Sequence, residues 1–342
     1  MIRSDTRILL CNNDFMILAR SPLRISLGGG GTDLPTYYER FGGFVLSAAI
    51  NKYVYVAIGR PFSNRLIIKY SNFESVADVN EISHPIIREV LKQYGTGPSG
   101  IEISTMADVP AGTGLGSSGS FTTALIKGLF AYHGKDIQPH ELASSACDIE
   151  MNKLSEPVGK QDQYVSAFGG VSTYHFLKNG DVTVQPLCLS TEVLNELNRN
   201  LLLFYTGKTR SASNILKDQV RKTQSGNQNM IENLNYIKEI GHKSLDALLS
   251  GNLENFGELM NDHWEFKKTR TIGMSNETIN LAYQEAVNNG AIGGKLVGAG
   301  GGGFLMFYAN DSEKLRMSME NLGLEELQFE FDFAGTSILI PS

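Results

Sequence analysis

Hydrophobic residues gather in short runs that alternate with polar or glycine-rich connections. In the first half of the chain, runs rich in Val, Ile, Tyr and Leu predict strands at 15–27, 44–59, 66–70 and 100–106. Phe121, Leu125 and Leu129 then recur at helical spacing, which predicts a helix just after two serines. A second helix is expected to start after Pro139 and to carry Glu150.

The second half continues with strands and then a run of helices. Strands are expected at 169–176, 182–187 and 201–206, and helices at about 230–250, 252–268 and 275–289. The tail predicts strands at 293–298, 302–309 and 328–333, with a helix at 311–321. Together with the strand at 201–206, this order suits a split β-α-β sandwich. We therefore expect an α+β fold in two halves, 1–190 and 191–342, with a polar loop at 208–230 that enters a helix.

Composition narrows the class of protein. The 342 residues carry a net charge of −6, which gives no electrostatic reason to expect nucleic-acid binding. Cys11, Cys147 and Cys188 lack paired spacing, which argues against a disulfide framework or a zinc site. No apolar run approaches the roughly 20 residues of a membrane span. We expect a cytoplasmic enzyme that is a monomer or a homodimer and binds small molecules, with neither nucleic acid nor membrane as partner.

Residues 110–120 read Pro-Ala-Gly-Thr-Gly-Leu-Gly-Ser-Ser-Gly-Ser and predict a phosphate-binding loop. Glycine lets the backbone bend tightly and approach a ligand closely, and the start of a helix attracts anions. The Walker A pattern is absent because no lysine precedes Ser117 or Ser118, and the Rossmann glycine spacing also fails. A purely structural turn is the alternative.

A second glycine run ends the first predicted strand. Ser21-Pro-Leu-Arg-Ile-Ser leads through four glycines to Thr32 and Asp33. Asp33 beside exposed backbone suits the recognition of hydroxyl groups, and Arg24 is a candidate to stabilise the charge of a transferring phosphate. The alternative is a flexible turn with an Asx cap at Asp33.

Two carboxylates and a third glycine run complete the candidate chemistry. Glu150 lies on the second predicted helix, and Asp162 lies in Gly159-Lys-Gln-Asp-Gln-Tyr. Taken alone, Glu150 is most simply a solvated residue and Asp162 a helix cap. As a pair of carboxylates after a phosphate loop, they suggest a metal ligand and a base. Lys160 would help to keep a neighbouring carboxylate ionised. In Lys295-Leu-Val-Gly-Ala-Gly-Gly-Gly-Gly-Phe, the glycines exceed what an ordinary hairpin needs, so their N–H groups are candidates to face a ligand.

These segments, in this order, resemble the GHMP kinase superfamily of galactokinase, homoserine kinase, mevalonate kinase and phosphomevalonate kinase. The resemblance covers nearly the whole chain. It implies a ribosomal-protein-S5-like N-terminal domain over 1–190 and a ferredoxin-like split β-α-β domain over 191–342. It also implies ATP and Mg²⁺ as cofactors and direct in-line transfer of the γ-phosphoryl group.

The resemblance assigns roles to positions of this sequence. Asp162 would act as the base on the sugar hydroxyl, with Arg24 and Lys160 beside it. Ser118, or less favourably Ser117, would coordinate magnesium together with Glu150. The ATP phosphates would lie on Pro110, Gly112, Gly114, Leu115, Gly116, Ser117 and Ser118. The sugar would contact Gly30, Gly31, Thr32, Asp33, Gln161, Gly300 and Gly301.

Within the superfamily, the chain most resembles the bacterial D-glycero-D-manno-heptose 7-phosphate kinases. Galactokinases place Glu-His before the Thr-Asp pair, whereas Gly30 and Gly31 stand here, which would enlarge the sugar pocket. The implied reaction is phosphorylation of the anomeric hydroxyl to the 1,7-bisphosphate, in surface-polysaccharide biosynthesis. For the 7-phosphate we expect a donor cluster of Lys208, Arg210, Ser211 and Ser213. A solvated basic loop is the alternative for this segment.

Other functions remain open on the sequence alone. A kinase for L-fucose, galactose or an unphosphorylated heptose is one alternative, and a non-catalytic sugar or nucleotide sensor is another. A nicotinamide dehydrogenase is disfavoured by the missing Rossmann spacing. Met16 is an alternative start, because a complete family-like beginning follows it.

Overall fold

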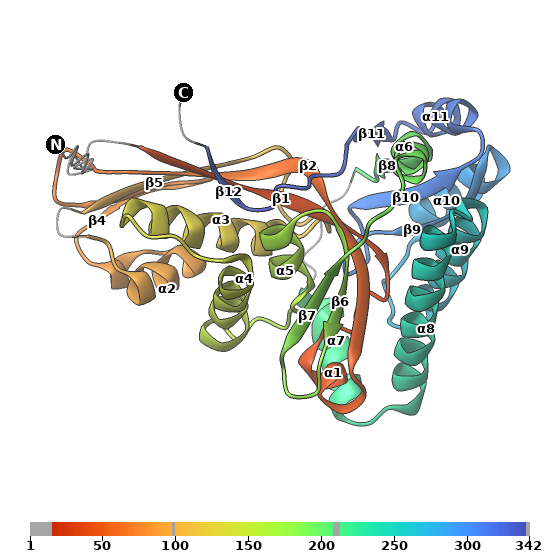
Figure 1. Ribbon diagram of the computed structural model, residues 1–342, viewed down its shortest axis with the longest axis horizontal. Helices are drawn as coiled ribbons and strands as arrows, with labels where there is room; N and C mark the ends of the chain where they lie inside the picture. Colours follow the sequence, from red (N-terminus) through yellow and green to blue (C-terminus); the bar gives the residue numbers. More distant parts are fainter. Residues whose placement is uncertain (1–15, 98–99, 208–212, 340–342) are drawn as a thin grey trace, which may run out of the picture.

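The computed structural model describes residues 16–97, 100–207 and 213–339, and of Ser213 only the backbone. Two sheets organise these residues (Figure 1). The expected α+β class is confirmed. The strands are β1 Ile17–Gly28, β2 Gly43–Gly59, β3 Leu66–Lys69, β4 Phe73–Val76, β5 Ile101–Ala107, β6 Val171–Phe176, β7 Val182–Pro186, β8 Leu201–Tyr205, β9 Ala291–Leu296, β10 Phe304–Ala309, β11 Glu325–Glu326 and β12 Ser337–Leu339.

The helices fall into a first group before β8 and a second group after it. The first group is α1 Pro35–Phe41, α2 Pro85–Tyr94, α3 Ser117–Tyr132, α4 Pro139–Cys147, α5 Gln161–Phe168 and α6 Thr191–Asn200, with a short 3₁₀ turn at Val79–Glu81 and a π-helical turn at Asp148–Lys153. The second group is α7 Ser213–Gln224, α8 Gln228–Ser250, α9 Leu253–Thr269, α10 Glu277–Asn288 and α11 Ser312–Asn321.

The larger sheet runs β12-β1-β2-β5-β3-β4, and β6 and β7 extend it from the first part of β2. The burial of β2 shows why one strand can serve both regions. Its first eight residues are all buried, whereas its later part alternates between buried and partly exposed positions. Continuous burial is typical of a strand covered on both faces and alternation of one covered on a single face. Helix α3 packs on β1 and β2, and α8 also packs against these strands.

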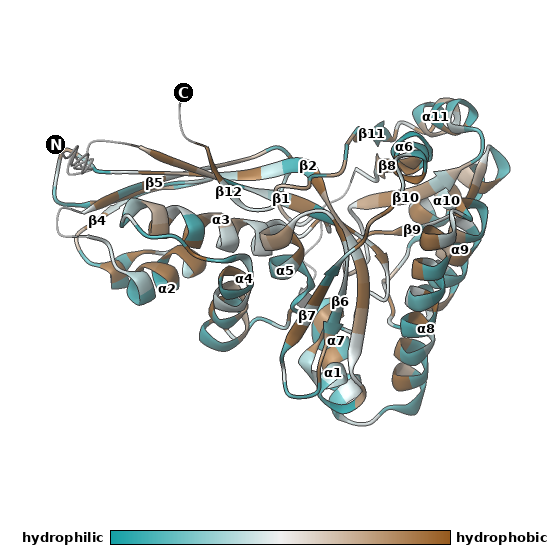
Figure 2. Cartoon of the chain, viewed as in Figure 1, coloured by the Kyte–Doolittle hydropathy of each residue, from teal (hydrophilic) through white to brown (hydrophobic). Residues whose placement is uncertain are grey.

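The smaller sheet has the antiparallel order β11-β8-β10-β9. Helices α8 and α9 pack against each other, and α9 lies along β9 and β10 (Figure 1). Figure 2 shows hydrophobic and hydrophilic positions alternating along both helices, as expected for helices with one buried face. Leu203, Phe256 and Met306 share one hydrophobic cluster with Leu23 and Ile25 of β1, so the same core joins the two sheets.

The predicted strands and helices mostly agree with the structure to within a few residues, and the tail is the main exception. The strand expected at 328–333 is absent; instead β11 pairs with β8, and Phe331 makes an isolated bridge to Ile50. The chain then returns to the larger sheet, where β12 pairs with β1. Strand pairing between residues this far apart in sequence leaves no local signal. The expected loop at 208–230 was also wrong from Ser213 on, because α7 forms there.

Candidate active site

The phosphate-loop candidate connects β5 to the start of α3. Gly116 is the N-cap of α3 in the left-handed conformation, with φ of 82°, and no side chain caps the helix. The first N–H groups of α3 therefore stay available to an anion, which the helix dipole also favours. The Ser117 hydroxyl is buried without a hydrogen-bond partner among the described residues. The loop thus offers donors without protein acceptors.

Not every residue predicted for this loop faces the site. Leu115 is fully buried in the core, and its carbonyl accepts the backbone N–H of Arg24 at 2.9 Å. The Pro110 carbonyl accepts the Thr113 hydroxyl at 3.0 Å, which closes the turn. Leu115 and Pro110 shape the loop, whereas Gly112, Gly114, Gly116, Ser117 and Ser118 line a cavity of about 440 Å³.

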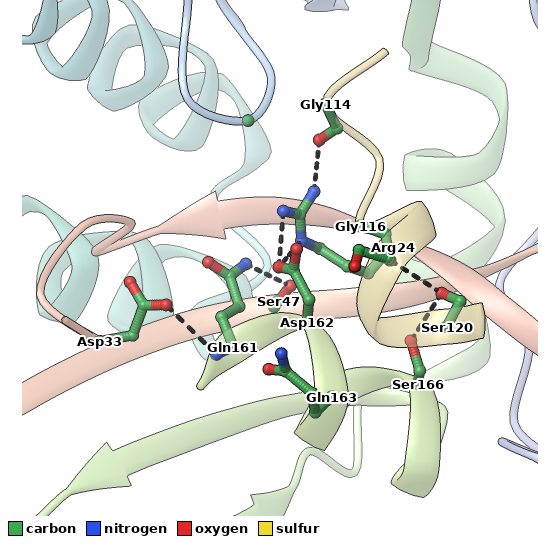
Figure 3. A network of polar contacts seen from close by, with 12 residues as sticks. Arg24, Asp33, Ser47, Gly114, Gly116, Ser120, Gln161, Asp162, Gln163 and Ser166 are labelled. Atoms are coloured by element: carbon green, nitrogen blue, oxygen red, sulfur yellow. Dashed lines mark hydrogen bonds and ion pairs between the residues drawn. The ribbon is translucent and has the colours of Figure 1, made fainter. Parts of the chain in front are cut away.

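Arg24 and Asp162 form an ion pair beside this loop. Arg24 Nε and Nη2 lie 2.8 and 2.6 Å from Asp162 Oδ1, and Arg24 Nη1 donates to the Gly114 carbonyl at 2.5 Å (Figure 3). Arg24 comes from β1 and Asp162 from the first turn of α5, and both line the cavity. A Cβ on Gly116 would lie 3.1 Å from Arg24 Cγ and 3.3 Å from Asp162 Cγ, so the glycine lets the loop lie against the pair. The Asp162 carboxylate therefore lies between the glycine loop and the cavity.

Ser118 and Glu150 meet on the other side of the α3 start. Ser118 Oγ donates to Glu150 Oε2 at 2.6 Å, and Gln163 Nε2 donates to Glu150 Oε1 at 3.1 Å. Burial raises the pKa of Glu150, although the hydrogen bonds from Ser118 and Gln163 oppose that rise. Two hard oxygen donors at this spacing fit Mg²⁺, which usually takes one or two protein ligands and keeps phosphate oxygens and waters for the rest. In the described part of the chain, no group of three or more His, Cys, Asp or Glu side chains is placed to hold a metal ion.

Asp33 reaches the cavity from the turn after β1. Its carboxylate accepts the backbone N–H of Gln161 at 3.2 Å (Figure 3). It also accepts the backbone N–H of Gly31 at 3.1 Å. Burial, and then the charge of Asp162, raises the pKa of Asp33. Gly30, Gly31 and Gln161 line the cavity beside it, so four predicted sugar contacts lie together.

Thr32 does not line the cavity, whereas Gly31 does, although the space beside Gly31 is not open. The Thr32 hydroxyl is fully buried between the carbonyls of Gly29 and Phe44, each 2.8 Å away, so it holds the turn together and does not line the cavity. At Gly31, a Cβ would lie 2.6 Å from Arg270 Nη1 and 3.0 Å from Gln219 Nε2. The space expected to enlarge the pocket is thus filled by these two side chains.

The C-terminal glycine turn packs on the phosphate loop. A Cβ on Gly298 would lie 2.5 Å from Gly114 Cα, which only glycine avoids. Gly298 and Ala299 line the cavity. Gly300 and Gly301, which we expected to contact sugar, lie against Met274 instead, and the Gly301 N–H donates to its carbonyl at 2.9 Å.

Lys160 does not join Asp162. Its ammonium donates to the Gly180 carbonyl and lies 5.1 Å from the centre of the Tyr38 ring. Among the described residues the cation paired with Asp162 is Arg24. The role expected for Lys160 is therefore corrected: it anchors the hairpin between β6 and β7. Lys208, Arg210 and Ser211 lie outside the described residues, as does the side chain of Ser213.

Sequence reasoning missed several polar residues of the cavity. They are Ser26, Gln219, His263, Lys267 and Arg270, and Lys295 was read only as part of the glycine motif. Each is buried. Charged residues in the last turns of the amphipathic helix at 253–269 look solvated in sequence, and only the packing of α9 on β9 turns Lys267 inward. In the described part of the chain, no helix is long and apolar enough to cross a membrane.

The chain matches known proteins along most of its length. Residues 80–170 match the N-terminal domain of GHMP kinases and residues 244–319 match the C-terminal domain. A D-glycero-alpha-D-manno-heptose 7-phosphate kinase of Campylobacter jejuni is 30% identical over 312 residues, which cover 88% of this chain and 91% of that protein.

Two further relatives extend the comparison. The crystal structure of a D-glycero-D-manno-heptose 1-phosphate kinase from Bacteroides thetaiotaomicron has a TM-score of 0.78 at 27% identity and covers 95% of this chain and 99% of that one. An L-fucokinase/L-fucose-1-P guanylyltransferase of Bacteroides fragilis is 28% identical over 356 residues, which cover 91% of this chain but only 36% of that protein. The chain belongs to the GHMP kinase family and is a sugar kinase, a phosphotransferase with an alcohol group as acceptor.

Proposed function

We propose that the protein transfers the γ-phosphoryl group of ATP to the anomeric hydroxyl of D-glycero-D-manno-heptose 7-phosphate, which gives the 1,7-bisphosphate. GHMP kinases use ATP as phosphate donor. The single observation that carries the chemistry is the Arg24–Asp162 pair at the edge of the uncapped start of α3. The choice of sugar rests on the similarity to the Campylobacter jejuni enzyme over most of both chains.

The ATP phosphates would lie on the loop before α3. The free N–H groups of the first helical turn and the unpartnered Ser117 hydroxyl are donors for phosphate oxygens. Close packing of Gly298 on Gly114 fixes the loop between the two sheets. The proposal is supported by the lack of protein acceptors for these donors, because buried polar groups nearly always have a hydrogen-bond partner.

Magnesium would be held by Ser118 and Glu150, whose oxygens already lie 2.6 Å apart. When bound, the ion would neutralise charge on the ATP phosphates. The Gln163 amide would continue to hold Glu150 in place through its hydrogen bond. Glu150 comes from the π-helical turn after α4, so its position depends on that local departure from α-helix.

Asp162 would accept the proton of the attacking hydroxyl. The hydroxyl oxygen would form a bond to the γ-phosphorus while the bond from that phosphorus to the bridging oxygen breaks, so ADP leaves without a phospho-enzyme. Arg24, fixed by Asp162 and by the Gly114 carbonyl, would stabilise the negative charge of the transferring group. Asp33 and Gln161 would orient the sugar through its hydroxyl groups, since both border the same cavity. Most of this catalysis is positioning, which agrees with phosphoryl transfer in general.

The test is an assay that couples ADP release to a colour change, with a panel of acceptors. The panel contains D-glycero-D-manno-heptose 7-phosphate, the unphosphorylated heptose, L-fucose and D-galactose. We expect the highest kcat/KM for the heptose 7-phosphate, and a product whose second phosphate is on the anomeric carbon by NMR. Higher kcat/KM for a free sugar would replace the proposed substrate, and no ADP release with any acceptor would favour the sensor alternative.

A further inference from the structure

Three cationic side chains border the cavity on the side of α9 and β9. Lys267 is 7% exposed, Arg270 is 6% exposed and Lys295 is 2% exposed. All three line the same cavity as Asp33 and Asp162. Burying a charge is unfavourable unless an opposite charge or strong hydrogen bonds compensate it. The groups that contact these three side chains therefore indicate whether their role is structural or ligand binding.

Their partners in the described residues are neutral. Lys267 Nζ donates to the carbonyls of Leu296 at 2.8 Å and Gly298 at 2.5 Å. Lys295 Nζ donates to the Leu27 carbonyl at 2.7 Å and lies 3.3 Å from His263 Nδ1.

Arg270 is held in the same way by neutral groups. Its Nε lies 3.1 Å from Asn233 Oδ1, and its Nη1 lies 3.3 Å from Gln219 Oε1. The negative charge of Asp33 acts on Arg270 from a distance, because the Asp33 carboxylate does not come within ion-pair distance of the guanidinium. The cluster therefore brings together three basic groups, none of which forms an ion pair with a carboxylate of the described protein.

One donor of the cluster has no acceptor. Arg270 Nη2 is buried without a hydrogen-bond partner in the part of the chain that the structure describes. The guanidinium is fixed by Asn233 and Gln219 on its other nitrogens, and Gly31 lacks the Cβ that would collide with it. An arginine fork that is fixed on one side and free on the other matches the oxygens of a phosphate group.

The pKa shifts of these basic groups favour an anion as their ligand. Burial, and then the charges of Arg270, Lys295 and Arg24, lower the pKa of Lys267 well below its ordinary value. Burial lowers the pKa of Arg270 to about 10, and only Asp33 opposes this. A bound dianion would reverse these shifts, because an opposite charge favours the charged form of a base.

We propose that Arg270 and Lys267, with the Gln219 amide, form the subsite for the phosphate group that the sugar acceptor already carries. This rests on the proposed function and adds to it where the acceptor's own phosphate lies. The ATP phosphates occupy the start of α3, so the cavity holds two separate anion positions. The sugar lies between them, with its anomeric end at Asp162 and its phosphorylated end beside Gly31. The subsite uses residues other than the predicted cluster around Arg210.

The test compares Arg270→Gln with the parent enzyme. We expect KM for heptose 7-phosphate to rise at least tenfold, with KM for ATP changed less than twofold. Lys238→Gln is the control, because Lys238 is a half-buried cation held by neutral acceptors, the carbonyls of Phe41 and Gly42, and lies away from the cavity. An Arg270→Gln enzyme with an unchanged KM for the phosphosugar overturns the subsite, as does one whose KM rises only for ATP.

Inorganic phosphate provides a test that does not depend on the folding of a variant. With the parent enzyme it should inhibit competitively against heptose 7-phosphate and not against ATP. Competition with ATP alone, or none with the phosphosugar, contradicts the subsite. The two proposals fail separately: a parent enzyme inactive on heptose 7-phosphate refutes the proposed function, whereas an active parent with an insensitive Arg270→Gln variant refutes only the subsite.

Discussion

Arg24 and Asp162 are joined by two contacts to a single carboxylate oxygen, at 2.8 and 2.6 Å, although 137 residues separate them in sequence. The Arg24 side chain is 7% exposed and that of Asp162 is 31% exposed. The pair is therefore buried on the arginine side and open on the aspartate side. This asymmetry leaves the second carboxylate oxygen able to meet a substrate while the first one is held.

Asp162→Asn keeps the shape of the side chain and an oxygen that accepts from Arg24, but it removes the base. We expect kcat to fall by about 10²- to 10⁴-fold, the usual contribution of a positioned general base. The KM for ATP should change little, because the loop before α3 does not depend on the charge of Asp162. Steady-state kinetics with thermal unfolding as a folding control measures this. A variant as active as the parent would remove Asp162 from the mechanism.

The parts of the site that could be predicted are those with local signals. The glycines at 112, 114 and 116 and the serines after them mark a turn into a helix, and the structure has that turn. Asp33 directly follows the second glycine run, and the Gly31 N–H that it accepts is two positions away in sequence. Glu150 has no such local signal, because it meets Ser118 across 32 positions, and its pairing with Ser118 came from the family resemblance.

The parts that could not be predicted depend on packing between distant segments. Lys160 follows the same glycine as Asp162, yet its side chain turns to Gly180 because the β6–β7 hairpin lies there. Arg270 reaches Gly31 only because α9 ends beside the turn after β1. Likewise, Phe331 bridges Ile50 through a pairing with no local pattern. Sequence spacing carries no information about such contacts.

Gly116→Ala should impair both stability and catalysis. The φ of 82° at Gly116 is unfavourable for alanine, and the added Cβ would lie only 3.1 Å from Arg24 Cγ. We expect a loss of about 1–2 kcal/mol in the free energy of unfolding from the backbone alone, together with a higher KM for ATP. Gly134→Ala is the matched control, because Gly134 has φ of 68° and no atom within 4 Å of the added Cβ. Urea unfolding should show a similar loss for both, and kinetics a defect for Gly116→Ala alone. An equal catalytic defect in both variants would contradict a role for the loop.

Glu150→Gln tests the magnesium ligand. Glutamine keeps the size of the side chain and its acceptance of the Ser118 hydroxyl, but it removes the negative charge that would bind the ion. We expect the Mg²⁺ concentration for half-maximal activity to rise at least about tenfold, while excess Mg²⁺ restores part of kcat. Titration of activity with MgCl₂ at fixed ATP measures this. An unchanged Mg²⁺ requirement would assign Glu150 to structure instead.

Lys295→Met should change how stability depends on pH. Burial lowers the pKa of Lys295 from 10.5 to about 7 in the folded protein. Between these two values the unfolded chain binds a proton that the folded protein does not, so raising the pH favours folding in the parent. Methionine cannot titrate, and it fills a similar volume. The free energy of unfolding of the parent minus that of the variant should therefore increase as pH rises from 7.5 to 9. The increase is at most about 1.4 kcal/mol per pH unit. Urea unfolding of both proteins at the two pH values gives this difference, in which the other titrating groups largely cancel. A difference that stays constant would mean that Lys295 keeps its charge in the folded protein, despite being only 2% exposed and held by one carbonyl and a histidine ring.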